Sequence, residues 1–127
     1  MQRHEIGSRG EQEAAKYLKK AGYHILHRNY HTQFGEIDLI VADATFLAFV
    51  EVKTRSVRSC SRAFPREAVD FHKRTRIIKT ALCYLATHSS ELQPRFDIIE
   101  IVTETSGNFA HCHIRHLPNA FSADGYQ

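Results

Sequence analysis

The chain has 127 residues, of which 43% are hydrophobic and 24% charged, and a net charge of +3; this composition predicts one globular domain over residues 1–127. It contains no apolar run of about 18 residues and no signal-peptide-like N-terminus, which excludes a transmembrane helix and predicts a cytoplasmic location. Cys60, Cys83 and Cys112 are odd in number and far apart, which argues against a disulfide framework or zinc cluster and predicts reduced thiols.

A first helix is expected over residues 8–21, ended by Gly22. Its buried face repeats at helical spacing and comprises Ala14, Ala15, Leu18 and Ala21. Glu11 shares that face and should point toward the rest of the domain. Two interpretations of Glu11 stay open. It could close a capping box with Ser8, or the helix could begin near Glu5 and leave Glu11 free for a site.

Three strands should follow, over residues 23–30, 36–42 and 46–53. Turns are expected at residues 33–35 and 43–45. In the second strand Ile37, Leu39 and Val41 should point one way, and Glu36, Asp38 and Ile40 the other.

The remaining chain predicts a loop, a helix and two strands. Residues 54–65 form a basic, Ser-rich loop, the segment expected to be the most mobile. The helix begins near Pro65, or later with Asp70 as its N-cap, and ends at residues 88–90. Its inward residues should be Ile77, Ile78, Ala81, Leu82 and Leu85. Residues 95–103 and 109–117 are strands joined by a hairpin at 105–108, so the order α-β-β-β-α-β-β predicts an α/β domain, a mixed sheet flanked by helices.

The apolar pattern selects the register of the second and third strands. A two-residue loop at Ala44 and Thr45, or a four-residue loop with the same centre, pairs residues whose numbers sum to 89, whereas a three-residue loop would pair charged with apolar positions. Apolar residues then face apolar residues, as in the pairs Ile37 with Val52, Leu39 with Val50, Val41 with Ala48, Ile40 with Phe49 and Ala42 with Leu47.

The same register sets Asp38 opposite Glu51, and Glu36 opposite Lys53. Like charges opposed across a sheet are destabilising. At a half-buried site their repulsion costs on the order of 1–4 kcal/mol. A divalent cation would resolve this conflict, because Mg²⁺ and Mn²⁺ prefer carboxylate oxygens.

Two carboxylates beside a lysine suit phosphodiester hydrolysis. Lys53 could position or deprotonate the attacking water or stabilise developing charge, and Glu36 could hold Lys53 in place. The structural alternative is an exposed Glu36–Lys53 ion pair next to a tolerated carboxylate pair. Asp97, close to Arg95, is better explained by a structural ion pair than by catalysis.

Positive charge gathers in one part of the chain. Nine of the 17 lysines and arginines lie between residues 53 and 79. This stretch is a candidate phosphate-binding surface, although a solvated helix face and loop would look the same. The residues expected to contact nucleic acid are Arg55, Arg58, Lys73, Arg74 and Arg76.

Asp38 followed by Glu51-Val52-Lys53 resembles the Asp…(Asp/Glu)-x-Lys motif of restriction-endonuclease-like nucleases, which include Holliday-junction resolvases. Over nearly its whole length the chain also resembles the YraN-type family of uncharacterised bacterial proteins. The segments that carry this resemblance are Gly10-Glu11, Ala15-x-Tyr17-Leu18, Gly22-Tyr23, Arg28-Asn29-Tyr30, Gly35-Glu36-Ile37-Asp38-Leu39-Ile40, Phe49-Val50-Glu51-Val52-Lys53-Thr54-Arg55, Arg95-Phe96-Asp97 and Asn119-Ala120-Phe121.

The resemblance implies a restriction-endonuclease-like fold and a metal-dependent endonuclease; DNA is the expected substrate, and the choice between DNA and RNA stays open. It implies that Asp38 and Glu51 bind Mg²⁺ or Mn²⁺, that Lys53 assists the attacking water, and that Glu11 can join the metal ligands. Ile37 stands where the wider superfamily often has proline, which removes no ligand. Whether the chain forms a homodimer is left open by the sequence. Two rival interpretations remain, a nucleic-acid-binding module that does not cleave and a scaffold that uses its basic stretch on an acidic partner.

Overall fold

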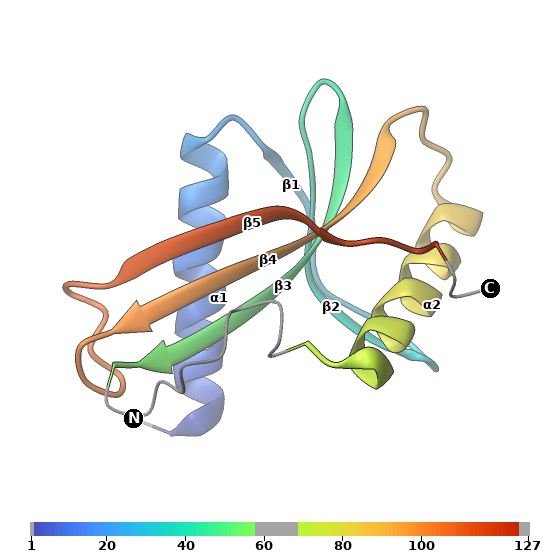
Figure 1. Ribbon diagram of the computed structural model, residues 1–127. Coiled ribbons are helices and arrows are strands. Elements are labelled where there is room, and N and C mark those ends of the chain that lie inside the picture. The colour runs from blue at the N-terminus through green and yellow to red at the C-terminus, as the bar shows by residue number, and fades with distance from the viewer. Residues whose placement is uncertain (1, 58–68, 125–127) are drawn as a thin grey trace.

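The computed structural model describes residues 2–57 and 69–124 (Figure 1). The described part of the chain folds into α1 (Arg3–Lys20), β1 (His24–Thr32), β2 (Gly35–Ala42), β3 (Phe46–Ser56), α2 (Phe71–Thr87), β4 (Gln93–Thr103) and β5 (His113–Phe121). The predicted fold class and the element order α-β-β-β-α-β-β are confirmed. Neither helix is long and apolar enough to cross a membrane.

The five strands form one mixed sheet in the order β1-β2-β3-β4-β5. Neighbouring strands are antiparallel except β3 and β4, which are parallel. Tight turns connect the antiparallel pairs of the first three strands, whereas a parallel pair needs a long crossover. The segment that contains α2 supplies this crossover between β3 and β4.

The sheet is buried on both faces because one helix covers each face (Figure 1). Ala14, Ala15 and Leu18 of α1 pack on one set of alternating strand residues, which includes Leu39, Val41, Ala48, Val50 and Ile99. The helix α2 packs on the other set through Ile77, Ile78, Ala81 and Tyr84. Side chains at the centre of β2 and β3 are therefore enclosed by a helix on either side.

The β2–β3 hairpin has the predicted register where the two strands are paired. Its pairs are Leu39 with Val50, Ile40 with Phe49, Val41 with Ala48 and Ala42 with Leu47. The Asp43 N–H donates to the Phe46 carbonyl at 3.0 Å, and the Asp43 carboxylate accepts hydrogen bonds from the N–H groups of Thr45 and Phe46. The predicted register of this hairpin is confirmed, and residues 43–45 connect its two strands.

Several expected boundaries are wrong at helix and strand ends. The first helix begins at Arg3 instead of residue 8, and the last strand begins at His113 instead of residue 109. Of the predicted loop 54–65, residues 54–56 continue β3, and residues from 58 onward lie outside the described part of the chain. The second helix takes the later of its two expected starts, because Asp70 is its N-cap.

Two apolar residues also differ from expectation. Leu82 was expected to be buried but is 56% exposed, because Tyr84 takes the inward position on that turn of α2. Ile37 packs with the α2-side core and not with Leu39, because the regular alternation breaks where β2 separates from β3. Cys83 and Cys112 are free thiols, and Cys60 lies outside the described residues.

A buried ion network fastens β4 to β5 and to the start of β1. The Asp97 carboxylate is fully buried. It accepts two hydrogen bonds from Arg95, each at 2.8 Å, and one of its oxygens lies 2.8 Å from His116 Nε2. Arg95 also donates to the Tyr23 hydroxyl at 2.6 Å. Burial raises the pKa of Asp97, but the hydrogen bonds from His116 and Arg95 outweigh it and leave that pKa below its usual value. The structural ion pair expected for Asp97 is confirmed.

Candidate active site

The site begins where β2 and β3 separate. Their backbone ladder ends at Leu39 and Val50, one position before Asp38 and Glu51. Instead of a backbone carbonyl, the Asp38 carboxylate accepts the Val52 N–H at 2.8 Å. The predicted pairs Asp38–Glu51 and Glu36–Lys53 are therefore not part of the described ladder. The separation leaves an opening between the strands in which the Asp38 side chain lies.

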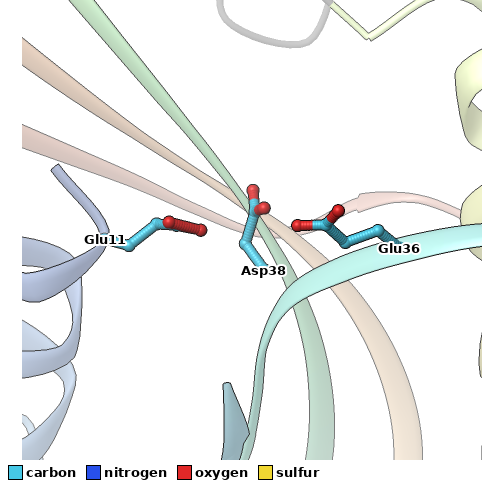
Figure 2. Close-up of side chains that lie close together, drawn as sticks. All are labelled: Glu11, Glu36 and Asp38. Carbon is cyan, nitrogen blue, oxygen red and sulfur yellow. The ribbon is translucent and has the colours of Figure 1, made fainter. Parts of the chain in front are cut away.

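Three carboxylates meet in this opening. Glu11 comes from α1, and Glu36 and Asp38 come from β2; Figure 2 shows the three side chains converging. One oxygen of each lies within 4.8 Å of one oxygen of the other two. Because α1 begins at Arg3, Ser8 lies inside the helix and does not cap it. Of the two interpretations of Glu11, the earlier helix start is the one observed.

Glu36 was not expected among the carboxylates of the site. The sequence suggested that it would hold Lys53, but its carboxylate lies 3.0 Å from His31 Nε2. That pairing follows from the β1–β2 register, in which His31 is opposite Glu36. Glu36 lies two residues before Asp38 on the same strand, and this spacing was the available signal that it belongs to the site.

Asn29 links the carboxylates from the β1 side. With its amide turned so that the nitrogen faces them, Nδ2 lies 2.9 Å from a Glu11 oxygen and 3.2 Å from a Glu36 oxygen. Its φ of 52° is in the left-handed region, which asparagine tolerates better than most residues. The sequence reasoning did not identify Asn29 as a site residue.

The fourth carboxylate, Glu51, is held by two lysines. It is only 7% exposed, and its Oε1 lies 2.5 Å from Lys73 Nζ and 3.8 Å from Lys53 Nζ. Lys53 shares the α2 side of β3 with Glu51 because the two are separated by one residue. Lys73 comes from the first turn of α2, where the Asp70 carboxylate accepts its N–H at 2.9 Å.

Two of the carboxyl groups, Asp38 and Glu11, have raised pKa values. Burial, followed by the negative charge of Glu51 and then of Glu11, raises the pKa of Asp38 to about 8, despite the hydrogen bond from Val52. Burial and the charges of Glu36 and Glu51 also raise the pKa of Glu11. Full ionisation of the four carboxyl groups would therefore place more negative charge here than Lys53 and Lys73 neutralise.

The lysines respond in opposite directions. Burial and the neighbouring Lys73 lower the pKa of Lys53. Burial alone would lower the pKa of Lys73 as well, but its hydrogen bond to Glu51 and the charge of that carboxylate raise it. Lys73 is thus the firmly charged partner of Glu51.

A pocket of about 370 Å³ opens between these groups and α2, lined by Gly35, Glu36, Asp38, Glu51, Lys73, Arg76 and Ile77. A smaller pocket of about 210 Å³ on the α1 side is lined in part by Glu11, Asn29 and Asp38. Asp38 is therefore reached from both faces of the sheet. Oxygen ligands this close together fit a hard divalent cation such as Mg²⁺ or Mn²⁺.

The residues expected to contact nucleic acid lie in different environments. Arg55 forms an ion pair with the buried Glu100, and Lys73 with Glu51. Arg74 donates to the Val69 carbonyl at 2.7 Å and stacks over Phe121. Arg76 is exposed and lines the larger pocket. Arg58 lies outside the described residues.

Comparison with known sequences gives consistent matches. Residues 10–101 match the family described as Uncharacterised protein family UPF0102. A UPF0102 protein of Caldanaerobacter subterraneus subsp. tengcongensis is 45% identical over 117 residues, which cover 91% of this chain and 93% of the relative. A UPF0102 protein of Chlorobium phaeobacteroides is 42% identical over 121 residues, 93% of this chain and 94% of the relative. One of Syntrophotalea carbinolica is 42% identical over 126 residues, 98% of both chains.

Proposed function

The chain belongs to the UPF0102 family, and we propose that it is a metal-dependent nuclease that hydrolyses phosphodiester bonds in DNA. The observation that carries the proposal is the meeting of Glu11, Glu36 and Asp38, whose oxygens lie within 4.8 Å of one another next to Glu51. His31 and Asn29 contact this cluster, and the neighbouring Glu51 is paired with Lys73 and Lys53. This is the chemistry that a hydrolase acting on phosphate needs.

The residues fit a divalent cation. Asp38 would be the central ligand, because it touches both pockets and lies beside Glu51, the second ligand expected from the sequence. Glu11 and Glu36 would complete the set. When bound, Mg²⁺ or Mn²⁺ supplies positive charge for the scissile phosphate and acidifies a coordinated water. The raised pKa of Asp38 supports this assignment, because a bound cation would compensate for the burial, and for the negative charges of Glu51 and Glu11, that raise this pKa.

Lys53 would act on the water and the phosphate. Its Nζ lies 3.8 Å from Glu51 and its side chain is 30% exposed, so the ammonium can reach a substrate phosphate without leaving the site. There it would orient the attacking water or stabilise the charge that develops on the phosphate oxygens. Arg76, exposed at the rim of the same pocket, would hold the phosphate backbone of the substrate.

The test is a cleavage assay with purified protein. Branched, flapped, single-stranded and duplex DNA are each incubated with Mg²⁺ or Mn²⁺, using the wild type, Asp38→Ala, Lys53→Ala and the control Glu91→Ala, which changes an exposed residue between α2 and β4. We expect metal-dependent cleavage by the wild type and the control, and a loss of at least about 100-fold in both site variants.

Two outcomes would contradict the proposal. Cleavage that persists in both site variants would come from another site or from a contaminating nuclease. Binding without cleavage on every substrate and with either metal would identify a nucleic-acid-binding module instead. DNA and RNA of the same sequence should be compared, because the carboxylate cluster itself does not distinguish them.

A further inference from the structure

The ammonium group of Lys73 contacts the Glu51 oxygen to which a metal ion would bind. Its Nζ lies 2.5 Å from Glu51 Oε1, which is closer than Lys53 Nζ at 3.8 Å. Glu51 is 7% exposed, so water screens this ion pair poorly. An oxygen bound to an ammonium group at this distance is not free to bind a metal ion at the same time.

The charges of the site explain the contact. Glu11, Glu36, Asp38 and Glu51 bring four carboxylates together, and Lys53 and Lys73 are the ammonium groups that contact Glu51. In the absence of a metal ion, Lys73 supplies part of the missing positive charge. Once a divalent cation is bound, the same ammonium becomes a second positive charge next to it, and the pairing loses its advantage.

Lys73 belongs to a different element from Glu51, so its ammonium group can move away from that carboxylate. Lys53 is fixed to the same strand as Glu51, whereas Lys73 reaches across from the first turn of α2. The Lys73 side chain is 33% exposed and lines the same pocket as Arg76, one turn further along the helix. Rotation of its flexible four-carbon stem would carry the ammonium from Glu51 toward the phosphate-binding side of the pocket.

We propose that Lys73 is the internal counter-ion of Glu51 in the metal-free protein, and that a divalent cation displaces it toward the substrate phosphate. This inference rests on the proposed metal-dependent function and adds a residue to it. Lys73 is a positioning residue until the cation arrives, and contacts the substrate afterwards. It also explains how four carboxylates can coexist in a folded protein before metal binding.

The experiment measures Mn²⁺ affinity by calorimetry, without nucleic acid, for the wild type, Lys73→Met and Lys73→Gln. Lys79→Met is the matched control, because Lys79 lies on an exposed part of the same helix, with its ammonium over the Phe34 ring. Removing the competing ammonium should tighten Mn²⁺ binding about fivefold, the upper range for a partly exposed ion pair. With saturating Mn²⁺, the same variants should cleave DNA more slowly, and Lys73→Arg should recover part of the rate.

The outcomes separate this inference from the proposed function. If Lys73 has a purely structural role, its replacement should weaken Mn²⁺ binding, because the site would lose its shape. Weaker or unchanged affinity in folded Lys73→Met and Lys73→Gln would therefore overturn the counter-ion inference but leave the proposed nuclease function standing. Absence of Mn²⁺ binding by the wild type and by both variants overturns the inference and the metal-dependent function together. Tighter Mn²⁺ binding by both variants, with no cleavage by any protein, supports the counter-ion role and contradicts the nuclease proposal.

Discussion

At the scale of single residues, Asp38 is the central acidic group of the site, and its surroundings disfavour its charged form. Its carboxylate replaces a backbone partner of Val52 and lies next to two other acidic groups, Glu11 and Glu51. The hydrogen bond fixes its position, while burial and neighbouring charges oppose its ionisation. The result is a carboxyl group that is held in place but is costly to ionise without a cation.

The raised pKa of Asp38 predicts a specific pH dependence of stability. Between pH 3.8 and about 8, the folded protein keeps a proton that the unfolded chain has lost, so the free energy of unfolding should fall as pH rises. Asp38→Asn keeps the acceptor oxygen for Val52 and removes the charge. We expect this variant to be more stable than the metal-free wild type by on the order of 2 kcal/mol at pH 8, and the difference to shrink toward pH 4.

Urea unfolding of both proteins across this pH range, in the presence of a chelator, measures the difference. Added Mn²⁺ should stabilise the wild type and have little effect on Asp38→Asn. A variant that is less stable than the wild type at pH 8 would show that Asp38 has a mainly structural role.

Glu36 provides a second prediction at this scale. If its carboxylate is a metal ligand, Glu36→Gln should weaken Mn²⁺ binding by roughly tenfold, because affinity follows the number of charged oxygen ligands. Glu91→Gln, at an exposed position outside the site, serves as the control. Calorimetry at fixed pH measures both. Equal affinity for Glu36→Gln and the wild type would show that Glu36 is not a metal ligand and only contacts His31.

At the scale of elements, the close approach of α1 to β3 brings Glu11 into the site. Gly10 makes this approach possible, since a Cβ at this position would lie 1.9 Å from Thr54 Oγ1. A glycine inside a helix costs about 1 kcal/mol relative to alanine. That cost is offset when the absence of a side chain allows the helix to pack closely on the strand.

Gly10→Ala should therefore lower the free energy of unfolding by about 1–3 kcal/mol, despite its better helix propensity, and should weaken Mn²⁺ binding as Glu11 moves away. Gly7→Ala is the matched control, because no atom lies within 4 Å of a Cβ there. It should be neutral or slightly stabilising. The double variant Gly10→Ala with Thr54→Ala removes the clashing hydroxyl and should recover stability, as measured by thermal unfolding. If stability is not recovered, the destabilisation by Gly10→Ala does not come from the contact with Thr54.

At the scale of the whole molecule, the distribution of positive charge should govern binding to nucleic acid. Of the basic residues placed near the site, Arg76 is exposed at the pocket rim, whereas Arg74 is bound to the Val69 carbonyl and the Phe121 ring. Each phosphate contact contributes about one unit to the slope of log affinity against log salt concentration.

Arg76→Gln should therefore reduce the salt slope for duplex DNA by about 1, while Arg74→Gln should leave it nearly unchanged. Fluorescence anisotropy between low and physiological salt measures the slopes. The two variants remove the same charge from positions two residues apart in α2, so a purely global charge effect would make their slopes equal. That result would argue against a defined phosphate contact at the pocket rim.

The sequence was sufficient to predict the element order and the paired part of the β2–β3 hairpin. Each depends on local or short-range signals, such as alternating apolar residues and the Asp43 turn. The register follows because a slip of one residue would pair the charged positions Asp38 and Glu51 with apolar ones. Those rules also placed Asp38 near Glu51. They failed at element ends. Residues 3–8 are mostly exposed and give no apolar pattern, whereas Phe109 is buried without belonging to a strand.

The tertiary structure decided what surrounds the two carboxylates. The separation of β2 from β3 at Asp38 depends on a side chain satisfying the N–H of Val52, which an ideal ladder cannot predict. The places of Glu36, Asn29 and Lys73 depend on the packing of β1 and α2 against this opening, and these elements lie far from β3 in the sequence. Periodicity shows which face of an element a residue takes, whereas only the packed chain shows which charges from distant elements meet.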